Sequence, residues 1–181
     1  MEEKLIEKPK WEFKTSAGLA TATVEQVWPL LEDFCNLHKW LPETLHECYR
    51  VGGILGQRPG LTRYCTFSRT LPSSDGHEAV TQTVYANDRL LSIDPIKRCF
   101  SYEMLDNNMG MKTYVATLRL LPINDDDDDD DGKLHACGCK IEWSFVCDPM
   151  EGWSFEDFSS FIAASLQTIA KNMEDATSLS S

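Results

Sequence analysis

The chain has 181 residues, of which 42% are hydrophobic and 25% charged, and its formal net charge at pH 7 is −12. This length and composition predict one globular domain over residues 1–181, with enough apolar side chains for a core. The acidic balance excludes a basic surface for nucleic acid, and no apolar run is long enough to predict a transmembrane helix.

Seven of the negative charges form a single run from Asp125 to Asp131, and without it the net charge is about −5. Self-repulsion within this run predicts a disordered loop at about 124–132. The run lacks the alternating ligands and terminal glutamate of a calcium loop. The seven cysteines are scattered and residues 1–10 have no apolar leader, so we expect reduced thiols in a cytoplasmic protein.

The first third of the chain predicts one strand, two short helices and a turn-rich stretch. Residues 11–20 alternate loosely, as a strand does, and Thr23 with Gln26 forms the capping-box pattern that begins a helix. Pro29 falls inside that helix and predicts a kink or a displaced start. Residues 38–41 predict a second short helix that ends before Pro42. The glycines that follow indicate hairpin turns: Gly52, Gly53, Gly56 and Gly60.

The remainder predicts a run of strands and then one long helix. Period-two patterning or β-rich composition marks the strand segments 61–70, 78–86, 98–104, 112–121 and 133–147. Ser154 is the expected N-cap of a final helix whose apolar stripe runs from Phe155 to Met173, with a frayed polar tail from Asp175. This order predicts an α+β fold in which an antiparallel sheet curls around the terminal helix and leaves a cavity.

Three polar residues, Arg63, Asp88 and Tyr114, fall on strand segments that would line such a cavity. Arg63 shares its parity with Cys65, and Tyr114 shares its parity with Leu118. Each also has a plainer interpretation, as a surface charge, a turn aspartate and a core tyrosine. A carboxylate in a partly apolar pocket can act as an acid or a base, so the three are our catalytic candidates.

The expected ligand-binding residues are large apolar or aromatic side chains on the same segments. They are Phe67, Tyr85, Phe100, Tyr102, Trp143, Phe145, Phe158 and Ile162, of which Trp143 and Phe145 fit a role in the core equally well.

Other catalytic patterns are missing from the sequence. Cys137 and Cys139 are one residue apart, whereas structural zinc sites space paired cysteines by two to four residues and need a second pair. We therefore predict buried thiols and no metal. The chain also has no Gly-x-Ser-x-Gly elbow of a serine hydrolase.

Several segments carry a resemblance to a known family: 25–34, 36–39, 62–64, 86–90, 100–102, 113–117, 143–147 and 151–152. Through them the chain resembles the START-like helix-grip superfamily, which includes plant pathogenesis-related class 10 proteins and abscisic-acid receptors. Within it the chain is most similar to the lachrymatory-factor synthase family, and the similarity covers nearly the whole chain.

The resemblance implies a helix-grip fold and a cofactor-independent rearrangement of a small sulfenic acid to a thial S-oxide. It places the family's active-site arginine on Arg63, its tyrosines on Tyr102 and Tyr114, and its catalytic glutamate on Asp88. Aspartate is one methylene shorter, which changes the reach of the carboxylate. In this scheme Asp88 shuttles the proton while Arg63 and Tyr114 hold the oxygen.

Two non-catalytic alternatives remain open. Residues 60–63 and 70–72 are similar to the corresponding segments of hormone receptors, and class 10 relatives imply a passive carrier that needs only the cavity. In every case the expected partner is a small hydrophobic or sulfur-containing metabolite, bound by a monomer without a cofactor.

Overall fold

The computed structural model describes residues 8–54, 56–71, 76, 78–123 and 138–179. The acidic loop expected at about 124–132 and the first residues of the strand expected at 133–147 lie outside this range. The elements in chain order are β1 (Trp11–Leu19), α1 (Val24–Leu31), η1 (Phe34–Lys39, a 3₁₀ helix), β2 (Leu45–Gly52), β3 (Thr62–Leu71), β4 (Val80–Asp94), β5 (Cys99–Asn107), β6 (Val115–Pro122), β7 (Cys139–Cys147) and α2 (Phe155–Ser178).

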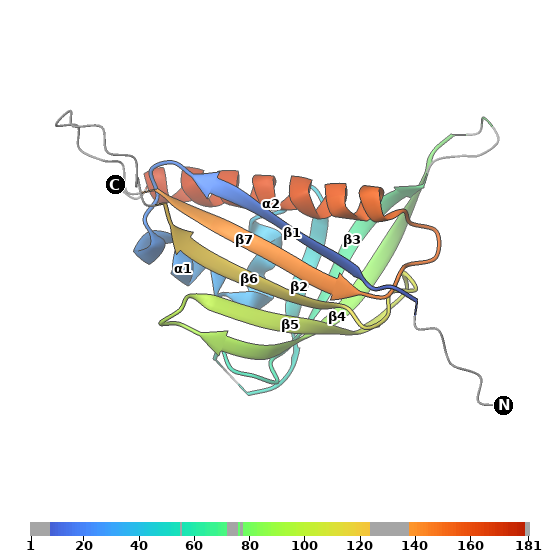
Figure 1. The fold of residues 1–181 in the computed structure, drawn as a ribbon, viewed down its shortest axis with the longest axis horizontal. Helices are drawn as coiled ribbons and strands as arrows, with labels where there is room; N and C mark the ends of the chain where they lie inside the picture. The colour runs from blue at the N-terminus through green and yellow to red at the C-terminus, as the bar shows by residue number, and fades with distance from the viewer. Residues whose placement is uncertain (1–7, 55, 72–75, 77, 124–137, 180–181) are drawn as a thin grey trace.

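Within the described residues, seven strands form one antiparallel sheet in the order β1-β7-β6-β5-β4-β3-β2. The sheet curves strongly, so that in Figure 1 β2 and β3 lie behind β6 and β7, and α2 runs along the open side. This confirms the predicted fold class of a curved antiparallel sheet around a long C-terminal helix.

The long helix α2 begins where the sequence predicts. The Ser154 hydroxyl accepts a hydrogen bond from the Asp157 backbone N–H at 3.0 Å. Its buried stripe faces the sheet and holds Phe158, Ile162, Leu166, Ile169 and Met173. The expected fraying from Asp175 is wrong, since the helix continues to Ser178.

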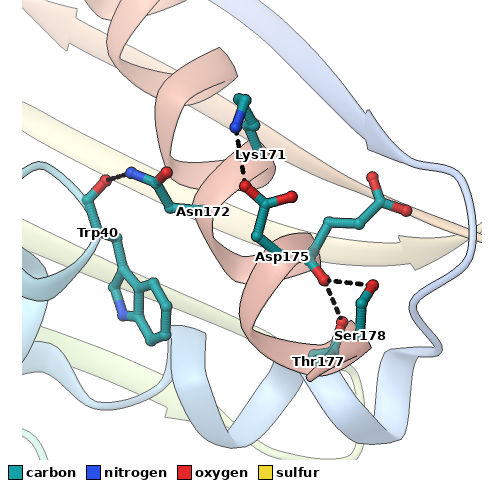
Figure 2. A network of polar contacts seen from close by, with 7 residues as sticks. Trp40, Lys171, Asn172, Asp175, Thr177 and Ser178 are labelled. Carbon is teal, nitrogen blue, oxygen red and sulfur yellow. Dashed lines mark hydrogen bonds and ion pairs between the residues drawn. The ribbon is translucent and has the colours of Figure 1, made fainter. Parts of the chain in front are cut away.

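The early helices differ in part from the prediction. Thr23 and Gln26 form both bonds of the capping box, so α1 has no displaced start and continues through Pro29. The short helix expected at 38–41 is present but begins and ends earlier, as a 3₁₀ helix over Phe34–Lys39. Figure 2 shows the hydrogen bond between α2 and the end of this 3₁₀ helix, in which the Asn172 side-chain amide donates to the Trp40 carbonyl at 3.0 Å.

Strand β2 is absent from the predicted strands for a physical reason. A register shift between Leu45 and Glu47 breaks the alternation, so buried positions recur every third residue rather than every second. The predicted hairpin after it is confirmed, and the backbone at Gly53 has φ 90°. A Cβ at Gly53 would lie 2.7 Å from the Gly60 carbonyl oxygen, so a side chain does not fit there. Among the described residues, no helix is long and apolar enough to cross a membrane.

Candidate functional site

A cavity of about 100 Å³ lies between the sheet, η1 and α2. A single ordered water needs about 10–15 Å³ on the same measure, so the space suits several waters or a small organic molecule. The lining is largely apolar, with a few polar groups: Leu37, Leu41, Thr44, Leu45, Arg63, Cys65, Phe67, Ala86, Asp88, Tyr102, Met104, Met109, Met111, Tyr114, Trp143, Trp153, Phe158, Phe161, Ile162 and Ser165.

Arg63 and Asp88 form a buried ion pair in the wall of this cavity. They are directly opposite one another on β3 and β4, and their exposed fractions are 4% and 5%. The Nε and Nη2 atoms of Arg63 each lie 3.0 Å from Asp88 Oδ2. Since two neighbouring strands fix both backbones, the pair is held in place before any ligand arrives.

Further contacts hold the Arg63 guanidinium from η1 and β5. Its Nη1 donates to the Phe34 carbonyl at 2.7 Å, and its central carbon lies 3.9 Å from the centre of the Phe34 ring and 4.9 Å from that of Tyr102. Burial alone would lower the Arg63 pKa, but the neighbouring Cys65 and Asp88 raise it, so the side chain stays charged. A guanidinium has five N–H donors, and these contacts use at most three of them.

Asp88 has one oxygen bound and one oxygen unpaired. Oδ2 receives both Arg63 contacts, while Oδ1 is buried and has no hydrogen-bond partner. Burial raises the Asp88 pKa above the ordinary 3.8, and Arg63 opposes that rise. An unpaired buried carboxylate oxygen costs free energy and is a ready acceptor for a proton or a hydrogen bond.

Two tyrosines and two tryptophans add further polar groups to the wall, besides Thr44, Cys65 and Ser165. Burial raises the pKa of Tyr102 and of Tyr114, so both remain neutral hydroxyls. Their rings pack 6.1 Å apart, beside the Arg63–Asp88 pair. The indole N–H groups of Trp143 and Trp153 are buried and lack a well-directed partner. The wall therefore offers one unpaired acceptor and several donors.

The structure brings together all three catalytic candidates, Arg63, Asp88 and Tyr114, at this cavity. The plainer interpretations of two of them are wrong. Arg63 is buried, and Asp88 lies within β4, which continues to Asp94, rather than at a turn. Tyr114 immediately precedes β6 and is buried.

The expected ligand-binding residues divide into three groups. Those that line the cavity are Phe67, Tyr102, Trp143, Phe158 and Ile162. Phe100 instead lines a neighbouring space of about 10 Å³, and Phe145 packs in the core against Tyr114 and Phe158. Tyr85 does not line the cavity. It lies on the opposite face of β4 from Ala86 and Asp88, stacks on Tyr64 and hydrogen-bonds Asp106.

Some lining residues escaped the sequence analysis. Met109 and Met111 come from the irregular chain after β5, where no periodicity marks a buried side chain. Met104 lies within β5 and has the parity of Phe100 and Tyr102, so the alternation could have found it. Trp153, directly before the Ser154 cap, could have been found as a hydrophobic residue in the N′ position of a helix. Among the described residues, no group of three or more His, Cys, Asp or Glu side chains is placed to hold a metal ion.

Comparisons with known proteins agree with this architecture. Residues 10–176 match the family described as polyketide cyclase / dehydrase and lipid transport. Among solved structures, the protein XoxI from Bacillus cereus matches with a TM-score of 0.60 and 19% identity, over 92% of this chain and 94% of that one. At this identity the match to XoxI shows a shared fold and no more.

Proposed function

The chain belongs to the polyketide cyclase/dehydrase and lipid transport family, and on that premise we propose that it is a cofactor-independent enzyme that rearranges a small, mostly apolar substrate by proton transfer. Membership in this family supports the binding of a hydrophobic ligand. The observation that carries the proposal is the unpaired Oδ1 of Asp88 in the wall of an apolar cavity.

Asp88 is suited to take up a proton and return it. Burial favours its neutral form and the Arg63 contact favours its charged form, so the two protonation states are brought closer in free energy. Proton transfer by a positioned carboxylate typically contributes about 10²–10⁴-fold to rate. Arg63 and the neutral Tyr114 hydroxyl can donate to a substrate oxygen, which would position the substrate and stabilise negative charge on it.

The specific reaction we propose is conversion of a 1-alkenyl sulfenic acid to a thial S-oxide. The Asp88 carboxylate removes the proton from the S–O–H group, and the same proton is delivered to the alkene carbon β to sulfur. The O–H electron pair stays on oxygen, the alkene π pair forms the new C–H bond, and a sulfur lone pair forms the second carbon–sulfur bond, which leaves sulfur positive and oxygen negative in the thial S-oxide. No atom or electron is gained or lost, so the step needs no cofactor.

A carrier of a small hydrophobic metabolite is the second candidate. The lining favours it through three methionines, Met104, Met109 and Met111, whose flexible side chains adapt to differently shaped apolar ligands. A carrier needs the cavity but no proton transfer, so the two functions respond differently to loss of the Asp88 charge.

The test compares turnover of freshly generated 1-propenesulfenic acid by the wild type, Asp88→Asn and Asp175→Asn, with the thial S-oxide as the product measured. Asp175 is a matched control because it is an exposed aspartate on α2 whose side chain pairs with Lys171. We expect Asp88→Asn to lose about 10²-fold or more in turnover and Asp175→Asn to match the wild type. An equal rate in Asp88→Asn would refute the role of Asp88. Binding of the product without turnover by the wild type would establish the carrier instead.

A further inference from the structure

Two cysteine thiols next to Arg63 are in direct contact with each other and have no role in the proposed proton transfer. Cys48 of β2 and Cys65 of β3 are directly opposite one another in the strand register. The Cys65 thiol donates to the Cys48 sulfur, with the two sulfur atoms 2.9 Å apart. Both residues are buried, with exposed fractions of 5% and 4%, and Cys65 also lines the cavity.

We propose that Cys48 and Cys65 form a redox-active dithiol that a small hydroperoxide, admitted through the cavity, converts to a cross-strand disulfide. The backbone geometry permits this bond. Directly opposed residues of an antiparallel pair have Cα atoms about 4.5–5.5 Å apart, which lies within the range of about 4.4–6.8 Å found in disulfides. The sulfur atoms need to approach by only about 0.9 Å to reach the bond length of about 2.05 Å.

The surroundings favour the thiolate, which is the reactive form of cysteine. The hydrogen bond from Cys65 lowers the Cys48 pKa to about 6, against the effect of burial, and the Arg63 charge and His38 of η1 act in the same direction. The Cys65 pKa moves the other way, because its hydrogen bond to Cys48 and its burial both raise it and Asp88 adds to the rise, so Cys65 is the thiol that keeps the proton. By contrast, burial raises the pKa of Cys139 and of Cys147 to about 11.

The chemistry balances with one equivalent of hydroperoxide. One thiolate attacks the peroxide oxygen, which gives a sulfenic acid and releases the alcohol, or water from hydrogen peroxide. The neighbouring thiol then attacks the sulfenic sulfur, the S–S bond forms, and water leaves. The two sulfur atoms lose two electrons in total and the peroxide gains them. Because Cys65 holds the shared proton, the Cys48 thiolate attacks first and Cys65 then attacks the sulfenic sulfur.

The test treats the reduced, full-length protein with one equivalent of hydrogen peroxide. Remaining thiols are then alkylated, and the peptides are identified by mass spectrometry before and after reduction. We expect a peptide pair linked through Cys48 and Cys65, lighter by two hydrogen atoms and separated by reductant. Cys48→Ala and Cys65→Ala should each abolish it, whereas Cys99→Ala, a half-buried thiol on β5, should leave it intact.

The rate at which peroxide consumes the first thiol, measured at a series of pH values, gives a second readout that needs no variant. This rate should reach half of its maximum near pH 6, the Cys48 pKa of about 6, rather than near the ordinary thiol pKa of about 8.5. Full alkylation of Cys48 and Cys65 after peroxide treatment would overturn the proposal. So would linkage of either residue mainly to a different cysteine, or a rate that follows the ordinary thiol pKa. These results are independent of whether the cavity turns over a substrate.

Discussion

The buried Arg63–Asp88 pair makes a quantitative prediction about stability. In Asp88→Leu the guanidinium of Arg63 stays buried without its carboxylate partner, and its remaining hydrogen bond is to the neutral Phe34 carbonyl. Removing one partner of a buried pair costs about 3–5 kcal/mol of unfolding free energy. The double variant Arg63→Met/Asp88→Leu loses both charges and leaves only the Phe34 carbonyl without its donor, which costs about 1–3 kcal/mol. The double variant should therefore be more stable than Asp88→Leu alone, by about 2 kcal/mol.

The assay is urea unfolding followed by tryptophan fluorescence, with the slope of free energy against urea checked to be constant among the variants. Asp175→Leu is the matched control, since its exposed pair with Lys171 should contribute less than about 1 kcal/mol. The reasoning is refuted if Asp88→Leu costs no more than this control. It is also refuted if the double variant loses the sum of the two single costs, because additivity would mean that the two charges do not interact.

Three further predictions concern the helix contacts and the pH dependence of stability at acid pH. Asn172→Ala should lower the unfolding free energy by about 1–3 kcal/mol, because the Trp40 carbonyl loses its donor (Figure 2), and calorimetry measures this. Ser154→Ala should cost about 1 kcal/mol through loss of the α2 cap, and Ser154→Thr should restore most of it in the same urea assay. Because burial raises the Asp88 pKa above 3.8, the native state binds that proton more tightly than the unfolded state does. The unfolding free energy should then fall as pH rises from about 3.8 through the raised native pKa, and Asp88→Asn should lack this component. Equal slopes of unfolding free energy against pH in the wild type and Asp88→Asn would contradict this pH prediction.

The sequence predicted the features that depend on strand parity and helix capping. Parity placed Arg63 and Tyr114 on the inner face, and the Thr23 and Ser154 caps located both α-helix starts. Tyr85 has the opposite parity from Asp88 and lies outside the cavity as the alternation requires, so an aromatic side chain alone does not indicate an inward position.

The features that the sequence did not reveal depend on contacts between distant segments. β2 was missed because a register shift removes its alternation, and that shift is defined only by pairing with β3. The contact between Cys48 and Cys65 follows from the same pairing, so neither residue stood out alone. The cavity-lining Met109 and Met111 lie in irregular chain, where only the tertiary structure determines which side chains face inward.

Occupation of the cavity beside Arg63 and Asp88 by a small ligand can be observed through methionine methyl NMR. Met104, Met109 and Met111 line the cavity, whereas Met150 is buried outside it. A protein labelled with ¹³C at its methionine methyl groups is titrated with dipropyl sulfoxide, a stable probe with an S=O acceptor and short apolar arms. We expect saturable chemical-shift changes of the three cavity methyls while the Met150 methyl signal stays in place. Shifts confined to Met150, or no shift of the cavity methyls at saturating probe, would contradict it.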